Sequence, residues 1–135
     1  MGSNPPFFSP WEKVHEGRAR DQEFIRGILQ LIIRHCVFAK FRPEITPEQK
    51  AEIYSGLGAL VGRIEGLLRA DFGPNISPEG RSGGFEDGFI MDLVDQAAVD
   101  RYLADPDHKA AGARLVAALE GGPEGLMIFD MEVSG

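Results

Sequence analysis

Three side chains in this sequence have the chemistry for acid–base work near neutral pH: His35, Tyr102 and His108. A histidine can take a proton from a substrate at this pH, and a tyrosine hydroxyl can donate a hydrogen bond to a developing oxyanion. Tyr102 and His108 are six residues apart, with Asp105-Pro106 between them. Because proline disfavours helical backbone in the preceding residue, we expect a helix break here, and such a break can turn both side chains into one pocket.

Each of these residues also has a plainer interpretation, and spacing alone favours it. His35 would be a packed core histidine, Tyr102 a packed tyrosine and His108 a helix-terminal residue. The third histidine, His15, lies near the N-terminus, where we expect it to be solvated.

The common cofactor and nucleophile motifs are missing. The chain holds no P-loop, no G-x-G-x-x-G, no G-x-S-x-G and no H-E-x-x-H. The glycine-rich segment 79–84 lacks the Lys-Ser/Thr ending of a phosphate loop, so we interpret it as a flexible loop. The acidic residues between Glu86 and Asp107 have no ligand-loop spacing and predict a solvated face instead of a metal site. We therefore expect no cofactor and no metal.

The elements that must position the candidate residues follow from periodicity and capping signals. His35 lies in the middle of an apolar stretch on the same side as Ile33 and Val37, which we expect to face helices. Thr46, followed by proline and by Gln49, predicts a helix start, and Asp95 predicts another. The expected strands are 29–41, 67–73, 85–93 and 126–133, and the expected helices are 46–66, 95–105 and 106–119.

This order is β-α-β-β-α-β, an α+β ferredoxin-like sandwich. In such a fold, two helices cover one face of the sheet and leave the other face bare. The first and last strands are nonetheless apolar on both sides, with Val133 closing the last one. An exposed apolar sheet face is typical of an interface, so we expect a homodimer that packs sheet against sheet.

The length of 135 residues fits one domain. We expect residues 1–29 to form a partly flexible N-terminal extension, with a short helix near 21–28, and residues 30–135 to form the domain. The single cysteine, Cys36, excludes an intramolecular disulfide, and no apolar run is long enough to cross a membrane. A cytoplasmic location is the expectation.

The net charge of −7 argues against nucleic-acid binding, which depends on clustered lysine and arginine. The window from Glu86 to Asp107 holds seven acidic residues and one base, Arg101. This window contains Tyr102 and ends beside His108. An acidic surround would repel anions, so we expect a small apolar or neutral ligand.

Several short segments resemble the stress-responsive dimeric A/B barrel family, in the order expected across residues 31–132. These segments are Arg34–Phe41, Gly73–Asn75, Gly83–Phe85, Tyr102–His108 and Ile128–Asp130. The resemblance implies a ferredoxin-like protomer and a dimeric α+β barrel.

The resemblance also implies a site. One member of the family, the plant olivetolic acid cyclase, closes a polyketide without a cofactor and carries a Tyr-x-x-His-Pro-x-His pattern. Here the pattern reads Tyr102-x-x-Asp105-Pro106-x-His108, which implies catalytic roles for Tyr102 and His108, with His35 as the supporting strand histidine. Asp105 replaces the middle histidine, and we expect this carboxylate to raise the basicity of His108. The implied wall of the ligand pocket consists of Val37, Ile53, Leu57, Phe89, Leu103, Asp105, Leu126 and Ile128.

Two functions remain open at this point. The first is a stress-responsive A/B barrel domain protein without assigned activity, a homodimer with a small apolar pocket between helices and sheet. The alternative is a cofactor-independent enzyme, of cyclase, lyase or monooxygenase type, that acts on a small carbonyl or aromatic compound. Because related dimeric barrels include cofactor-free monooxygenases and haem-degrading enzymes, oxidation of a small aromatic compound is a weaker third option, whereas haem binding is disfavoured. A shared fold does not decide among these options.

Overall fold

The structure is a computed structural model that describes residue 24 and residues 30–135. The expected extension over residues 1–29, its short helix and His15 therefore lie outside the described residues, apart from Phe24. Residues 32–133 form a compact unit. Its elements are β1 (Leu31–Ala39), α3 (Pro47–Gly58), β2 (Leu67–Pro74), β3 (Asp87–Leu93), α4 (Gln96–Ala104), α5 (Pro106–Ala117), the 3₁₀ turn η1 (Gly122–Gly125) and β4 (Leu126–Ser134).

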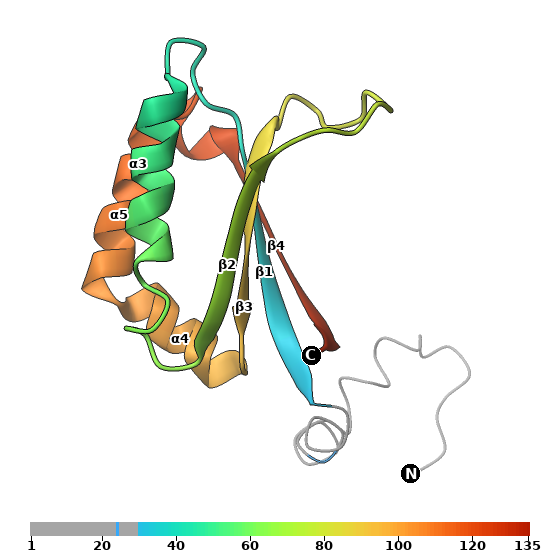
Figure 1. Ribbon diagram of the computed structural model, residues 1–135, viewed down its shortest axis with the longest axis vertical. Coiled ribbons are helices and arrows are strands. Elements are labelled where there is room, and N and C mark those ends of the chain that lie inside the picture. The colour runs from blue at the N-terminus through green and yellow to red at the C-terminus, as the bar shows by residue number, and fades with distance from the viewer. Residues whose placement is uncertain (1–23, 25–29) are drawn as a thin grey trace, which may run out of the picture. The chain divides into compact units, whose positions relative to one another are not determined.

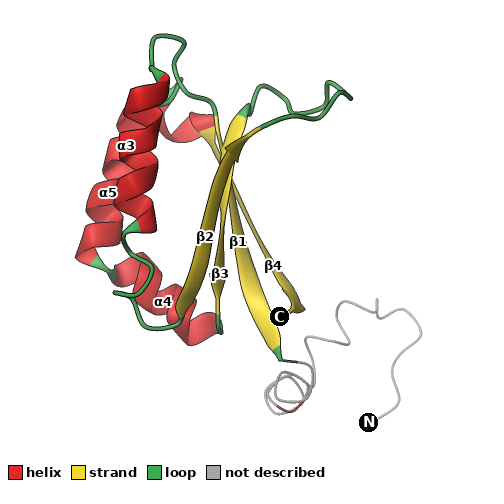
Figure 2. Cartoon of the chain, in the orientation of Figure 1, coloured by secondary structure: helices red, strands yellow, loops and turns green. Residues whose placement is uncertain are grey.

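The four strands form one sheet in the order β2-β3-β1-β4. Strand β3 pairs antiparallel with both β1 and β2, and β4 runs opposite to β1. Helices α3, α4 and α5 all lie on the same face of this sheet (Figures 1 and 2). The predicted ferredoxin-like α+β fold is confirmed.

Helix α3 begins as predicted but ends earlier than expected. The Thr46 side chain accepts a hydrogen bond from the Gln49 backbone amide, and the Gln49 side chain accepts one from Thr46 N–H, which completes a capping box. The helix ends at Gly58, not near Gly66, and Gly62 has a φ of +88°. A left-handed residue cannot continue a right-handed helix, so our placement of Gly62 inside the helix was wrong.

The break between α4 and α5 lies where the Asp-Pro pair predicts it. Asp105 has extended backbone (φ −69°, ψ 128°), and Pro106 is the first residue of α5. The Asp105 carboxylate accepts hydrogen bonds from the backbone amides of Asp107 and His108, at 2.8 and 3.0 Å. Asp105 thus ends one helix and caps the next, which turns the chain sharply between Tyr102 and His108.

The core lies between the helices and the inner face of the sheet. Its most completely buried large side chains are Tyr102, Leu57, Leu60, Met91 and Leu93. We expected Leu103 to point inward beside Tyr102, but it is half exposed. Consecutive helical residues differ by about 100° in direction, and here Ala98, Val99 and Tyr102 occupy the inner face of α4.

Strand β4 is the least covered element of the sheet. Met127, Ile128, Phe129 and Met131 are all between 42% and 56% exposed. Alternation along the strand places Ile128 on the helix side and the other three on the outer face. An apolar surface of this kind is unusual for an isolated domain. Ile128 borders the cavity described below, and the other three side chains form a surface that a second protein molecule can cover.

Candidate functional site

A cavity of about 390 Å³ lies between α5 and the inner face of the sheet. Its size is within the range of small-molecule sites. The lining residues are His35 and Val37 of β1, Leu57 of α3, Phe89 of β3, Tyr102 of α4, His108, Lys109, Gly112, Ala113, Leu115 and Val116 of α5, and Leu126 and Ile128 of β4. All three candidate catalytic residues therefore border the same space.

Tyr102 lies between the two histidines. Its ring centroid is 3.9 Å from that of His108, with the planes tilted by 38°, and 5.5 Å from that of His35, in an edge-to-face arrangement. Tyr102 reaches this position from the last turn of α4, and His108 from the first turn of α5. The helix break at Asp105 is what allows residues six apart in sequence to stack closely.

His35 enters from the sheet and is held by a residue of the neighbouring strand. It is 5% exposed, and its Nδ1 lies 2.7 Å from Oδ1 of Asp130 on β4. An ionised carboxylate only accepts hydrogen bonds, so the imidazole donates from Nδ1. In neutral His35 this leaves Nε2 as the acceptor, and the Asp130 contact fixes the orientation of the ring.

Burial governs the protonation of the other two groups. Burial raises the pKa of Tyr102, and the charge of Asp130 adds to this, so the phenol keeps its proton at neutral pH. Burial is also the largest cause that lowers the pKa of His108 below its ordinary 6.5, with a smaller contribution from His35. Asp105 raises the pKa of His108, as we expected, but burial outweighs it. Our expectation of increased basicity was therefore wrong.

The cavity wall differs from the one implied by the resemblance at three positions. Val37, Leu57, Phe89, Leu126 and Ile128 line the cavity. Three other expected residues do not: Ile53 packs against the core cluster one turn earlier on α3, the Leu103 side chain is half exposed, and the Asp105 carboxylate caps α5.

Helix α5 contributes more to the cavity wall beyond His108 than the sequence predicted. Lys109, Gly112, Ala113 and Val116 follow at helical spacing, and all of them line the cavity. Projecting the helix from His108 would have found this stripe, because residues three and four apart share a face. Gly112 and Ala113 have no large apolar side chain, so hydrophobic periodicity does not mark these positions as part of a buried or cavity-lining face.

The acidic window does not surround the cavity with negative charge. None of its seven carboxylates lines the cavity. Three form ion pairs: Asp87 with Lys50, Asp92 with Arg34 and Asp107 with Arg63. The other four have local partners: Asp95 and Asp105 cap helices, Glu86 accepts from Asn75 and Ser82, and Asp100 accepts from Gln96. The expected repulsion of anions is therefore not supported at the cavity itself.

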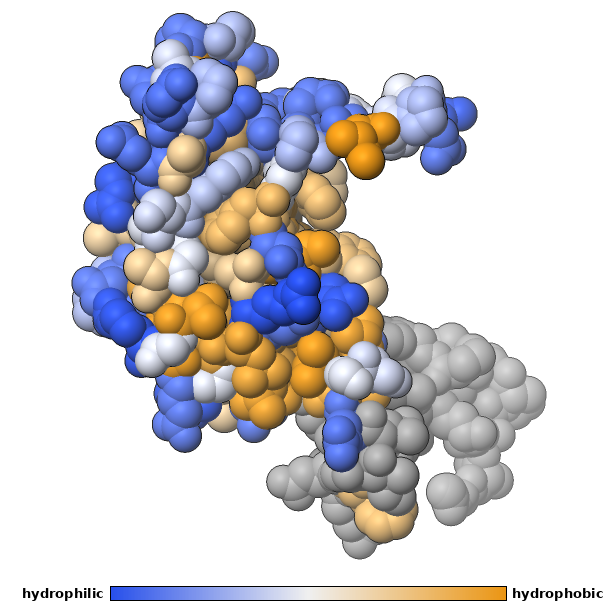
Figure 3. Space-filling model, viewed as in Figure 1, coloured by the Kyte–Doolittle hydropathy of each residue, from blue (hydrophilic) through white to orange (hydrophobic). Residues whose placement is uncertain are grey.

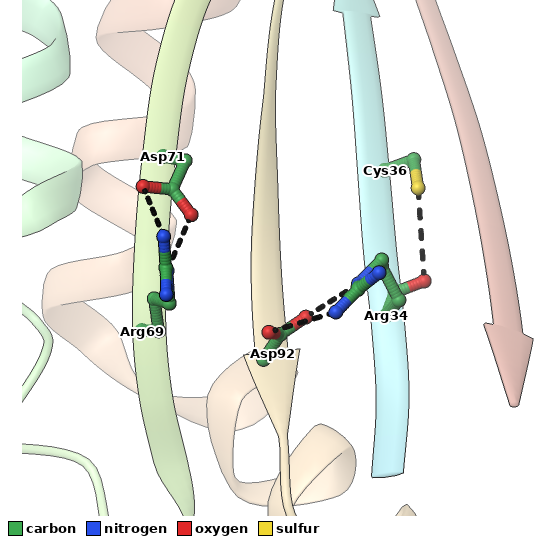
Figure 4. Close-up of polar contacts among 5 residues, drawn as sticks. All are labelled: Arg34, Cys36, Arg69, Asp71 and Asp92. Carbon is green, nitrogen blue, oxygen red and sulfur yellow. Dashed lines mark hydrogen bonds and ion pairs between the residues drawn. The ribbon is translucent and has the colours of Figure 1, made fainter. Parts of the chain in front are cut away.

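The outer face of the sheet carries a different set of side chains. Two ion pairs lie on it: Arg34 of β1 pairs with Asp92 of β3, and Arg69 pairs with Asp71 along β2 (Figure 4). Burial raises the pKa of the Cys36 thiol beside them. A groove of about 500 Å³ continues along this face beneath the loop between β2 and β3.

In Figure 3, α3 and α5 present mostly hydrophilic residues on their outer side, and hydrophobic residues gather beside the sheet. The loop between β2 and β3 projects from the body and carries Ile76, whose side chain is 88% exposed.

Among residues 24 and 30–135, no three or more histidine, cysteine, aspartate or glutamate side chains are grouped so as to hold a metal ion. No helix in the same part of the chain is long and apolar enough to span a membrane.

Comparison with known proteins identifies the family. Residues 33–133 match the stress responsive A/B barrel domain. The chain belongs to this family. It is 29% identical over 76 residues to the stress-response A/B barrel domain-containing protein HS1 of Arabidopsis thaliana, a match covering 56% of this chain and 70% of that protein.

Solved structures of similar fold include a protein of unknown function and an enzyme. A dimeric ferredoxin-like protein of unknown function from Jannaschia sp. CCS1 is 31% identical, with a TM-score of 0.71 over 76% of this chain and 99% of that one. The hydroxynitrile lyase of Passiflora edulis is 18% identical, with a TM-score of 0.67 over 76% and 93% of the two chains. At that identity, the likeness to the lyase shows the fold alone.

Proposed function

We propose that this A/B barrel protein binds a small, largely apolar molecule in the cavity between α5 and the sheet. The observation that carries the proposal is the composition of the wall. Aliphatic and aromatic side chains surround a compact polar group of His35, Tyr102 and His108. Apolar walls supply affinity, and a few polar groups at fixed positions orient the ligand.

Titration with small carbonyl compounds tests this proposal. Benzaldehyde and 2-hexanone are suitable probes, with the imidazole signals of His35 and His108 followed by NMR on the full chain. Saturable shifts of both imidazoles support binding in the cavity. If shifts were confined to residues outside the cavity, or failed to saturate, the proposal would be wrong.

A second candidate is a cofactor-independent acid–base enzyme, and the Tyr102–His108 stack favours it. His108 is neutral at pH 7 because its pKa is lowered, so it can take a proton from the carbon next to a carbonyl. Tyr102 remains protonated because its pKa is raised, so its hydroxyl can donate a hydrogen bond to the enolate oxygen that forms. His35, held by Asp130, would orient the substrate from the sheet side.

The buried Nδ1 of His108 adds to this candidate. It has no hydrogen-bond partner among the described residues. A buried polar atom without a partner is costly in a purely structural role, and a ligand group is one way to satisfy it.

Hydrogen–deuterium exchange at carbon tests this chemistry without knowledge of the natural substrate. In D₂O, the wild-type protein should accelerate loss of the α-protons of 2-hexanone, as measured by NMR. His108→Ala should abolish the acceleration, and Tyr102→Phe should reduce it by about a hundredfold, as for loss of one oxyanion donor. Equal exchange by wild type and His108→Ala would assign the protein to the non-catalytic class.

We also propose a homodimer that forms through the outer face of the sheet. Met127, Phe129 and Met131 supply an apolar surface there, and a similar solved structure is described as dimeric. A β4 edge with both faces exposed is the kind of surface that association covers.

Sedimentation analysis of two variants tests the dimer. Phe129→Glu places a charge on the apolar surface, so the sedimenting species should change from a dimer to a monomer. Ala110→Glu, on an exposed position of α5, should not. A monomeric wild type, or a dimeric Phe129→Glu, would contradict this interface.

A cytoplasmic location completes the proposal. It is supported by the single buried thiol of Cys36, which fits a reducing compartment. Imaging of a tagged full-length chain in its own cells tests it, and an extracellular or membrane-bound signal would refute it.

A further inference from the structure

Among the described residues, Lys109 is the only lysine, arginine, aspartate or glutamate that lines the cavity. The rest of the lining is apolar except for the two histidines and Tyr102. Lys109 is exposed to solvent and lines the cavity as well, which places its side chain at the rim. A lysine can lay its apolar stem along such a wall while its ammonium group remains in water at the entrance.

This ammonium group has no partner of opposite charge in the described part of the chain. No carboxylate among residues 24 and 30–135 lies within ion-pairing distance of it. Its charge nevertheless acts on the cavity, because it contributes to lowering the pKa of His108. The nearby carboxylates of Asp105 and Asp107 are already engaged, one as the cap of α5 and one with Arg63.

Open space adjoins this cation on the same face of α5. Gly112 lies one helical turn beyond Lys109 and also lines the cavity. Apart from its chain neighbours and the backbone of its own helix, no atom of the described residues lies within 4 Å of the position that a Cβ at Gly112 would occupy. Across the opening, Ile128 of β4 is 56% exposed. An elongated apolar group can therefore extend from the cavity past Gly112 to the rim.

We infer that the cavity takes an amphiphilic ligand with one anionic carboxylate, whose head pairs with Lys109 while its apolar body lies between α5 and β4. This inference rests on the proposed binding function and names its ligand class. It reverses the expectation of a neutral ligand, because the acidic residues behind that expectation are paired elsewhere and Lys109 is not.

A pair of ligands matched in length tests the inference. Octanoate and octanamide differ in charge but have the same chain, and their binding to the full-length protein at pH 7 can be measured by calorimetry. We expect octanoate to bind about fivefold more tightly, the upper range for a solvent-exposed ion pair. Lys109→Met should remove this preference, and Lys109→Arg should retain it.

Arg114→Met serves as the matched control. Arg114 lies on the same helix and has an exposed side chain, but its guanidinium group faces Gly56 of α3. This variant loses the same charge as Lys109→Met, so a general effect of net charge would appear in both. A preference for octanoate that survives Lys109→Met, or that Arg114→Met removes equally, would overturn the inference.

The outcomes separate the inference from the function on which it rests. If octanoate and octanamide bind equally and both shift the His35 and His108 signals, the cavity binds ligands but the charge preference is wrong. If neither compound binds and the carbonyl probes also fail, both the inference and the proposed binding function are wrong.

Discussion

Replacing Gly112 by leucine should stabilise the domain and block its cavity at the same time. Glycine inside a helix costs about 1 kcal/mol relative to alanine, and leucine is nearly as favourable as alanine. Gly112 is within α5, and beyond its chain neighbours and its own helix backbone a Cβ there meets no atom of the described residues within 4 Å. The substitution therefore removes the cost of a glycine inside the helix without introducing a steric clash. We expect the free energy of unfolding to rise by about 0.5–1 kcal/mol.

The same side chain points toward the space that a ligand needs. Gly112 lines the cavity and is four residues from His108, hence on the same helical face. Four added carbon atoms at this position should fill the entrance to a cavity of about 390 Å³. We expect the affinity for benzaldehyde or octanoate to fall at least tenfold, with Gly112→Ala giving a smaller loss.

Thermal unfolding followed by circular dichroism, together with calorimetric titration, measures both effects. For a domain of about 100 residues, 1 kcal/mol corresponds to a rise in Tm of about 4–8 °C. Ala110→Leu, on an exposed face of α5, is the control that should leave binding unchanged. A stabilised Gly112→Leu variant with wild-type affinity would refute the proposed ligand path. A lower Tm would show that the space beside Gly112 is not open.

Three further predictions follow from the helix caps and the buried titratable groups. Because the pKa of His108 is lowered in the folded state, the unfolded chain binds that proton more readily, and stability should fall as the pH drops below about 6.5. His108→Gln should flatten this fall in urea unfolding between pH 7.5 and 5.5, and an unchanged slope would contradict the assignment. Asp105→Ala should lower the free energy of unfolding by about 1 kcal/mol, because the N-cap of α5 is lost. Asp105→Asn should retain most of this stability, since asparagine is also a good N-cap. Equal losses in the two variants would show that the cap is unimportant. Burial raises the pKa of the Cys36 thiol, so iodoacetamide should react slowly with the native chain at pH 7 and much faster in urea, and equal rates would refute its burial.

Local signals predicted the elements well because they act within a few residues. The capping box at Thr46 and the Asp105-Pro106 pair each depend on groups that are neighbours in sequence, and both helix starts are found where expected. The end of α3 was less predictable. Gly62 is compatible with a helix as well as with the left-handed turn that it adopts, so its residue type alone does not show where α3 ends.

The sequence predicted which residues form the candidate site but not the electrostatic environment of those residues. His35, Tyr102 and His108 do border one cavity, as the resemblance to the A/B barrel family implied, although their spacing alone favoured packed structural roles. The sign of the pKa change at His108 was wrong, because the sequence shows the nearby Asp105 but not the burial that outweighs it. Lys109 was overlooked for a similar reason, since exposure at a rim is a property of the surrounding elements.

What the sequence determined by itself is the order of strands and helices, the break that separates Tyr102 from His108, and the total charge. These depend on backbone preferences and on composition, which need no distant partner. Only the tertiary structure decided where the charges act. It pairs His35 with Asp130, 95 residues away, engages the acidic window in caps and ion pairs, and leaves Lys109 at the cavity rim. Electrostatic interactions depend on distance and burial in space, and neither can be read from spacing along the chain.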